Sequence, residues 1–291
     1  MNNKFKIFIA KASSLLPDRL YIELRYFLTF RKKLNINNPK TYNEKLQWMK
    51  LKDRNPKYHE LVDKEEVKKY VEHLNLTDVK TIPTLHVWDT PEDIDVTNMP
   101  DKFVLKCTHD SGSVRVYHDK KDFNRNEAIE YFNTRIKRSQ YKAGREWAYK
   151  GIKPRIIAEP YMHDDITGEL RDYKFFCFNG KVKAMFIATD RGKIDTDVKF
   201  DFFDEHFNHL PIRHGHENAT QIPQKPMKFD EMKCAAEHLS RGLRAVRVDL
   251  YEINREIYFG EYTFYHHCGF VPFCPNEWDY TFGQWLNISD D

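Results

Sequence analysis

The chain has 291 residues, of which 41% are hydrophobic and 14% aromatic, enough for about two compact domains, and this composition excludes a disordered or fibrous protein. The formal net charge is only +3, and the sequence shows no basic stripe with interleaved aromatic residues, so we expect no nucleic-acid partner. Five cysteines without a CxxC pair suit a reducing cytosol better than a disulfide framework, so we expect a cytoplasmic protein.

The first 40 residues carry an excess of positive charge. They hold nine Lys and Arg residues against two acidic ones, a net charge of +7, so the other residues together carry −4. The apolar run at residues 7–10 is too short for a secretory signal, and no segment reaches the roughly 20 apolar residues of a membrane span. We expect a basic helical arm over residues 1–40. This arm contacts an anionic partner, which is the inner face of the membrane or a glycan carrier. The alternative is that the arm packs on its own domain.

The remaining elements are predicted from periodicity. Residues 41–100 form a helical region, with a capping box at Thr41 and Glu44 and apolar spacing of three or four in KTYNEKLQWMKLKD and HELVDKEEVKKYVEHLN. An extended piece, TIPTLHVWDTPEDI, and a strand over FVLKCTH follow, and then a helix over residues 122–140. Strands dominate the second half, apart from a helix near residues 229–242. This irregular alternation predicts an α+β fold with mainly antiparallel sheets.

The strongest cluster of polar residues lies in a predicted hairpin near the C-terminus. The motif R-x-D at residues 247–249 and the motif E-x-T at residues 261–263 each put two polar side chains on one strand face. A hairpin centred on Arg255 sets Asp249 opposite Glu261, whereas a two-residue loop would break that register. Facing carboxylates repel unless a cation lies between them, and Mg²⁺ suits that place. The alternative is a solvent-facing hairpin with a surface ion pair.

Three weaker clusters precede the hairpin. Lys106 ends a strand before the small-residue turn at residues 111–113, where an ammonium group and backbone N–H groups can surround phosphate oxygens; an ordinary turn is the alternative. The strand end at residues 159–162 offers apolar walls for an adenine, or is plain core. Asp172 and Lys174 share a strand face, which by itself is only a surface pair.

Taken in order, these motifs resemble the TupA-like ATP-grasp family. The resemblance runs from about residue 40 to residue 285 and rests on YNEKLQWMKL, the LVDK stretch, FVLKCTHDSG, GREWAYKGIKPRIIAEPYM, DYKFFCFNGK, VRVDLY, YFGEYTFY and PNEWDY. It implies an ATP-grasp fold in which two α+β subdomains, residues 101–158 and 159–291, hold ATP between them.

The resemblance also implies roles for single residues. The implied nucleotide-binding residues are Lys64, Lys106, Ser111, Gly112, Ser113, Glu159, Pro160, Tyr161, Met162 and Asp172. Lys174 and Arg247 are the implied catalytic cations. The implied Mg²⁺ ligands are Asp249, Glu261 and Thr263, and Thr263 stands where ATP-grasp proteins usually have Asn.

The activity that the resemblance implies is an ADP-forming carboxylate–amine ligase that works through an acyl phosphate. Its partners would be an anionic sugar or polymer, such as a uronic acid, and an amino acid, in the synthesis of a bacterial capsule or cell-wall polysaccharide. Arg145, Lys150 and Arg155 are suggested for holding an anionic acceptor.

Three alternatives stay open. One is a kinase of the same fold that phosphorylates a glycan hydroxyl. Another is a nucleotide-sugar glycosyltransferase, with the motif at residues 201–204 interpreted as its metal site, or a protein associated with such an enzyme. Alternation along a strand, however, puts the two carboxylates of this motif on opposite faces. The third is a non-catalytic protein that binds a glycan or docks on a membrane.

A histidine pair follows the hairpin. His266 and His267 precede Cys268, but neighbouring residues of a strand point to opposite faces, and no second His or Cys pair is suitably spaced. We therefore expect no zinc site. One of the two histidines lines the acceptor pocket, or both only pack.

Overall fold

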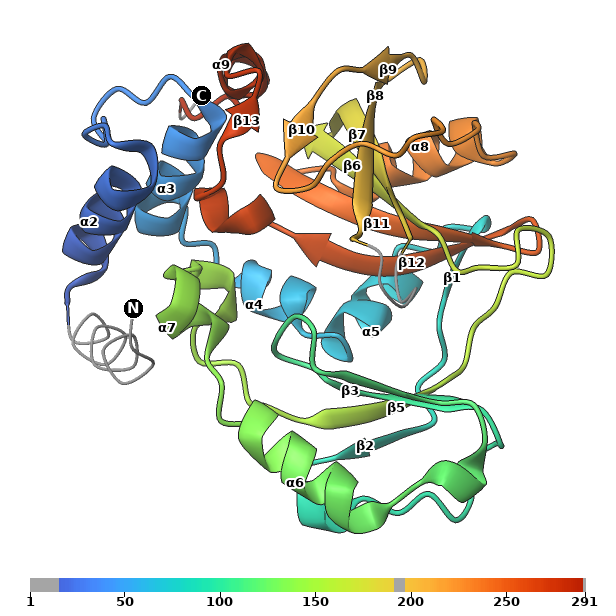
Figure 1. The fold of residues 1–291 in the computed structure, drawn as a ribbon. Helices are drawn as coiled ribbons and strands as arrows, with labels where there is room; N and C mark the ends of the chain where they lie inside the picture. The colour runs from blue at the N-terminus through green and yellow to red at the C-terminus, as the bar shows by residue number, and fades with distance from the viewer. Residues whose placement is uncertain (1–15, 191–196, 290–291) are drawn as a thin grey trace.

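Two β-sheets organise the fold, which a computed structural model describes for residues 16–190 and 197–289 (Figure 1). The smaller sheet has the strand order β2-β5-β3-β4, and all its pairs are antiparallel. Helix α6 (Arg125–Arg135) covers one face of it, with Phe132 packed into the same apolar cluster as Phe103. The strands are β2 (His86–Trp88), β3 (Phe103–Cys107), β4 (Val114–Tyr117) and β5 (Ile156–Pro160).

The larger sheet has the order β1-β12-β11-β6-β7-β8-β9 and is antiparallel except for the pair β1 and β12. A two-stranded sheet of β10 (Arg213–His214) and β13 (Phe273–Cys274) lies beside it. The strands of the large sheet are β1 (Val79–Thr81), β6 (Asp172–Phe178), β7 (Lys181–Thr189), β8 (Lys199–Asp204), β9 (His209–Leu210), β11 (Ala245–Ile253) and β12 (Glu256–Thr263).

Helices cover the large sheet on both faces. The helices other than α6 are α2 (Asp18–Phe30), α3 (Tyr42–Lys52), α4 (Lys57–Val62), α5 (Glu66–His73), α7 (Gln140–Gly144), α8 (Phe229–Leu239) and α9 (Glu277–Trp285). Short 3₁₀ turns complete the fold, namely η1 (Pro91–Asp93), η2 (Lys120–Asp122), η3 (Trp147–Tyr149) and η4 (His266–Gly269).

The central strand β6 shows why both faces are covered. All seven of its residues are buried. Phe175 points to α8, with its ring centroid 6.2 Å from that of Phe229, whereas the next residue, Phe176, points to the opposite face and lies 5.2 Å from Phe282 of α9. The apolar run at residues 175–178 is expected of a strand buried on both faces, whereas the buried Asp172 and Lys174 are charged.

Helices form in the regions where the sequence predicts them, but two of them have different boundaries. The capping box of α3 is confirmed, because Thr41 Oγ1 accepts from the Glu44 backbone and Glu44 Oε2 accepts from the Thr41 backbone, both at 3.2 Å. The helical stretch HELVDKEEVKKYVEHLN is two helices, α4 and α5. It breaks because Asp63 Oδ1 accepts from the backbone of Glu65 and Glu66, which caps α5. The break places Lys64 in the turn between the helices.

The helix predicted over residues 122–140 is shorter. It begins after Asn124, whose side chain accepts from the backbone of two following residues, and it ends at Arg135. Helix α7 follows as a separate short element.

The predicted N-terminal arm is described only from residue 16, so its first 15 residues lie outside the described part of the chain. Within the described part, one face of α2 packs on the domain through Ile22 and Tyr26, which share an apolar cluster with Phe270. The helix is 13 residues long, and none of the described helices could cross a membrane.

The two sheets divide the chain differently from the subdomain boundaries inferred from sequence. Strand β2 comes from residues 41–100 but pairs with β5, and β5 itself crosses the division between residues 158 and 159. Strand β1, from the same helical region, pairs with β12 of the other sheet. The small sheet therefore spans residues 86–160.

The hairpin of β11 and β12 has the predicted pairs but not the predicted loop. Its loop is the two-residue turn Asn254-Arg255, with positive φ at both positions, as a tight hairpin turn requires. A bulge at Gly260 adds one residue to β12 and thereby restores the opposition of Asp249 and Glu261. The predicted pairing is confirmed because the bulge compensates for the shorter loop.

Replacing Gly260 by Val tests this bulge. A Cβ there would lie 3.0 Å from the Asp249 carbonyl oxygen and 3.0 Å from the Tyr251 ring. We expect Gly260→Val to lower the free energy of unfolding in urea by about 1–3 kcal/mol, because overpacking shifts backbone and side chains. The control Tyr258→Val, on the same strand, should change it by less than about 1 kcal/mol. Equal losses in both variants would show that the bulge imposes no special constraint.

Candidate active site

Arg247 lies at the centre of the hairpin cluster. Its Nε and Nη2 donate to the two carboxylate oxygens of Asp249 at 2.6 and 2.8 Å. Nη2 also donates to Thr263 Oγ1 at 2.9 Å and lies 3.6 Å from Glu261 Oε1. The pairing of β11 with β12 thus brings together all four residues of the R-x-D and E-x-T motifs.

This geometry corrects one step of the sequence argument. The facing carboxylates of Asp249 and Glu261 were expected to need a metal ion between them, but the guanidinium group of Arg247 already supplies a positive charge there. The opposition of the two carboxylates therefore does not by itself require a metal.

Strand β6 adds a second cation to this cluster. Lys174 pairs with Asp249 across the sheet, donates to its carboxylate, and lies 3.3 Å from Asp172 Oδ1. Burial lowers the pKa of Lys174. Burial alone would raise the pKa of Asp249, but the charges of Arg247 and Lys174 outweigh it and hold that pKa below its usual value. Asp249 is therefore an ionised carboxylate although it is fully buried.

A second charged cluster comes from the small sheet and α5. Glu159 of β5 is 4% exposed and accepts from Lys106 Nζ of β3 at 2.5 Å and from Lys68 Nζ of α5 at 2.7 Å. The two lysines outweigh the effect of burial and lower the pKa of Glu159. Lys68 was missed from the sequence. Lys68 follows Lys64 by four residues, a spacing that puts two side chains on one side of a helix. This spacing could have predicted that Lys68 lies near the same ligand as Lys64.

The loop between β3 and β4 is tied to the turn between α4 and α5. Lys64 Nζ donates to the Asp110 carbonyl oxygen, and Ser113 Oγ donates to the Asp110 carboxylate. Gly112 has φ +85°, with open space where a Cβ would stand. Such a loop can approach a ligand with its backbone.

The two clusters face a single cavity of about 200 Å³. Of the residues singled out from the sequence, its lining includes Lys64, Lys106, Ser111, Gly112, Glu159, Asp172, Lys174 and Glu261, together with Lys68. Arg247, Asp249 and Thr263 lie directly behind Lys174 and Glu261. Ammonium groups from both sheets thus converge on one space, an arrangement that can bind a polyanion such as a triphosphate.

Four of the predicted nucleotide-binding residues are placed elsewhere. Within the described chain, the cavity lining does not include Ser113 or residues 160–162. Ser113 is buried beside Asp110, and Tyr161 packs its ring against His118 and His163 beyond the end of β5. The structure therefore does not bring these four residues together with the lysines.

The donors of the hairpin fit Mg²⁺ in kind. Asp249, Glu261 and Thr263 present carboxylate and hydroxyl oxygens, which hard cations prefer. The Glu261 side chain is 36% exposed and lines the cavity. Asp249 Oδ1 accepts one hydrogen bond from the described residues, which leaves a lone pair on that oxygen.

The basic residues suggested for an acceptor have other contacts. Arg145 is 3% exposed and lies 3.6 Å from Asp18 of α2. Arg155 pairs with Asp63 and Glu66, and Lys150 lies over the rings of Tyr141 and Trp147. Arg145 and Arg155 are thus engaged in packing and ion pairs.

The motif at residues 201–204 is structural. Asp201 is fully buried and accepts from the Ala219 backbone, whereas Asp204 accepts from the backbone of His206 and Asn208 in the turn after β8. The two carboxylates serve separate turns, so they do not form a shared metal site.

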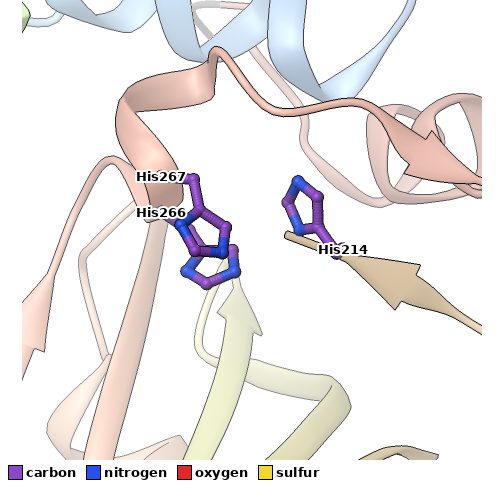
Figure 2. Close-up of side chains that lie close together, drawn as sticks. All are labelled: His214, His266 and His267. Atoms are coloured by element: carbon purple, nitrogen blue, oxygen red, sulfur yellow. The ribbon is translucent and has the colours of Figure 1, made fainter. Parts of the chain in front are cut away.

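The expectation that His266 and His267 point to opposite faces of a strand is wrong. His266 and His267 lie in η4, not in a strand, and His267 has a left-handed backbone with φ 49°. Their ring centroids are therefore only 4.1 Å apart, and His214 of β10 faces both of them at 5.0 Å (Figure 2). His266 Nδ1 accepts from Arg247 Nη1 at 2.6 Å, which connects this cluster to the hairpin cluster.

Comparison with known proteins gives a family match and several solved structures of low similarity. Residues 44–287 match a family described as TupA-like ATPgrasp. The D-alanine–D-alanine ligase from Bacillus anthracis complexed with ATP is 13% identical, with a TM-score of 0.40 over 70% of this chain and 53% of that one. The D-alanine–D-alanine ligase from Helicobacter pylori is 15% identical, with a TM-score of 0.43 over 79% of this chain and 60% of that one. The ATP-grasp ligase PsnB complexed with a minimal precursor is 11% identical, with a TM-score of 0.43 over 75% of this chain and 58% of that one.

The chain thus spans between 53% and 60% of the length of these solved structures. No curated protein matches its sequence.

Two sheets with charged side chains converging between them, in a chain that matches this family, define an ATP-grasp protein. The match covers most of the chain, so the protein belongs to the TupA-like ATP-grasp family. The family resemblance and the α+β ATP-grasp fold predicted from the sequence are confirmed.

Two neighbouring lysines of α5 offer a matched test of the cavity. Lys68 lines it, whereas Lys69 points outward and pairs with Glu66. We expect Lys68→Met to weaken the binding of magnesium–ATP by at least about tenfold, since a charge-assisted contact contributes about 1.5–3 kcal/mol. Lys69→Met should leave the affinity unchanged. Isothermal titration calorimetry measures both, and equal affinities for the two variants would remove Lys68 from the site.

Proposed function

We propose that the protein is an ATP-dependent, ADP-forming carboxylate–amine ligase. It would link an amino acid to a uronic acid or an acidic polymer in the synthesis of a bacterial surface polysaccharide. The observation that carries the proposal is the cavity in which lysines of both sheets meet the Arg247 and Asp249 cluster, in a chain of the TupA-like ATP-grasp family. The choice of substrates rests on the family resemblance.

The lysines suit the phosphate end of a nucleotide. Lys68 and Lys106 are held by Glu159, and Lys174 is held by Asp249, so the positions of their ammonium groups are set before phosphate oxygens approach. Fixed cations of this kind stabilise charge at little reorganisation cost. Gly112 of the loop that Lys64 holds can bring backbone N–H groups to the same phosphates.

Asp249, Glu261 and Thr263 would hold Mg²⁺, which when bound neutralises charge on the phosphate oxygens. A substrate carboxylate oxygen would attack the γ-phosphorus, and the bond to the bridging oxygen of ADP would break. Lys174 and Arg247 would neutralise the charge on the transferred group.

The nitrogen of a neutral amine would next attack the carbonyl carbon of the acyl phosphate. An amide forms, inorganic phosphate leaves, and the proton lost by the nitrogen passes to phosphate or solvent. This sequence requires no covalent nucleophile on the enzyme.

The first experiment follows ADP and phosphate release. The protein is incubated with magnesium–ATP, a panel of uronic acids and a mixture of amino acids, and products are identified by mass spectrometry. We expect an amide, ADP and phosphate in equal amounts. ADP with a phosphorylated sugar would replace the ligase by a kinase. No turnover together with no thermal stabilisation by nucleotide would favour a binding protein.

Variants of the hairpin serve as controls for this assay. We expect Asp249→Asn and Glu261→Gln to lower turnover by at least about 100-fold, because each replaces a proposed carboxylate ligand of Mg²⁺ by a neutral amide. The matched control Glu256→Gln changes an exposed carboxylate of the same strand that pairs with Lys80, and it should retain activity. Near-normal activity of both Asp249→Asn and Glu261→Gln, with unchanged melting temperatures, would refute the metal assignment.

A further inference from the structure

Three buried ring nitrogens of the histidine cluster have no hydrogen-bond partner among the described residues. They are Nδ1 of His214, Nε2 of His266 and Nε2 of His267. Buried polar atoms in proteins almost always have partners, so three such atoms in one cluster need an explanation. One ligand atom of each ring lies within 4.8 Å of those of the other two rings (Figure 2).

The three rings are uncharged at neutral pH. Burial lowers the pKa of His214 to about 3 and that of His267 to about 4, and it lowers the pKa of His266 well below its ordinary value. His214 Nε2 lies 3.0 Å from the Val271 carbonyl oxygen, so its proton is on Nε2 and Nδ1 keeps a lone pair. A backbone carbonyl on the far nitrogen is the usual support of a metal-binding histidine.

We propose that His214, His266 and His267 bind a divalent transition-metal ion of the zinc class. Imidazole nitrogens are preferred ligands of Zn²⁺, and three histidines leave a fourth position for water. Gly215 lines a cleft of about 780 Å³, and His267 Nε2 lies next to this glycine, so the cluster is directly behind the wall of the cleft.

Binding of the ion has a consequence for Arg247. Because His266 Nδ1 accepts from Arg247, the proton of the neutral ring is on Nε2. Coordination through Nε2 displaces that proton, and a neutral ring then carries its proton on Nδ1, where it meets the Arg247 N–H group. Two donors cannot share this bond, so Arg247 must leave His266. Binding of the ion would thus inhibit turnover. This inhibition rests on the proposed function, whereas the binding of the ion is independent of that function.

Zinc titration of chelator-treated protein tests the site. We expect one equivalent of Zn²⁺ to bind, and one equivalent of Co²⁺ to give the visible absorption of a low-coordinate nitrogen site. His214→Gln and His267→Gln should each lower the affinity for Zn²⁺ by at least about 100-fold. Removing a residue that only supports a ligand lowers metal affinity by about 10- to 100-fold, and removing the ligand itself should lower it by more. His73→Gln, an exposed histidine of α5, is the control and should bind as the parent protein does.

Several outcomes would overturn the proposal. If Zn²⁺ fails to bind at micromolar concentration, a buried water is the better occupant of the cluster. Binding that survives both substitutions would assign the ion to exposed thiols such as Cys234 and Cys274. Melting temperatures of the variants show whether the fold is kept, and the cobalt spectrum of the parent protein is decisive even if a variant does not fold.

The outer face of α2 carries a second, independent inference. Four large apolar side chains, Leu20, Leu24, Phe27 and Leu28, are between 47% and 55% exposed. Their spacing of four, three and one residues puts them on one side of the helix, opposite the packed Ile22. We call these four residues the α2 stripe.

The charges around the α2 stripe are mainly positive. The exposed residues Arg31, Lys32 and Lys33 follow the helix directly. The two carboxylates of α2 are engaged, because Glu23 pairs with Arg19 and Asp18 pairs with basic residues of the domain.

We propose that the α2 stripe and its basic end dock on an anionic lipid surface. An amphipathic helix with apolar residues on one side and basic residues beside them lies in the plane of a membrane. Each basic residue near an anionic membrane contributes about 1 kcal/mol. A protein partner would not need this combination.

Co-sedimentation with vesicles tests the docking surface. We expect binding to vesicles of phosphatidylcholine with 30% phosphatidylglycerol, about tenfold weaker binding to phosphatidylcholine alone, and loss of binding at high salt. Leu24→Ser with Phe27→Ser should abolish binding. Ile222→Ser with Met227→Ser removes apolar groups of similar exposure elsewhere and should not. The proposal fails if the anionic vesicles do not bind, or if the α2 substitutions instead dissolve a dimer seen by light scattering.

Discussion

The buried carboxylate of Asp249 is the constraint on which the rest of the site depends. An ionised group without solvent is costly unless opposite charges surround it. Arg247 meets it with two hydrogen bonds, and Lys174 adds a third from the neighbouring strand. The Lys174 contact requires β6 to lie beside β11 in this register, and the contacts of Arg247 with Thr263 and Glu261 require β12 on the other side. The sheet order and the site are therefore one structural requirement.

The small sheet repeats this arrangement of a buried carboxylate between two cations. There a buried carboxylate, Glu159, is the anchor and two lysines, Lys68 and Lys106, are the groups that it orients. The lysines that the two anchors hold line one cavity, so cations from separate parts of the chain are held at one place. Such pre-positioned charges are what a highly charged substrate needs.

Arg247 also connects the cavity to the histidine cluster behind it. One side of its guanidinium group contacts Asp249 and Thr263, and the other donates to His266. The contact between the two clusters is a single hydrogen bond of 2.6 Å, so a change at His266 that removes it would free Arg247 to shift relative to Asp249.

The sequence by itself determined the family, the α+β class and the two motifs that carry Asp249 and Glu261, whereas the opposition of these two residues also needs the bulge at Gly260. These features depend on local order, namely side-chain alternation in a strand, capping at Thr41 and the succession of motifs. The tertiary structure alone decided which charges neutralise one another. Lys68 and Glu159 are 91 residues apart, and His214 is 52 residues before His266, so no local pattern relates them. The left-handed turn at His267 and the bulge at Gly260 likewise arise from packing, which local propensity does not encode.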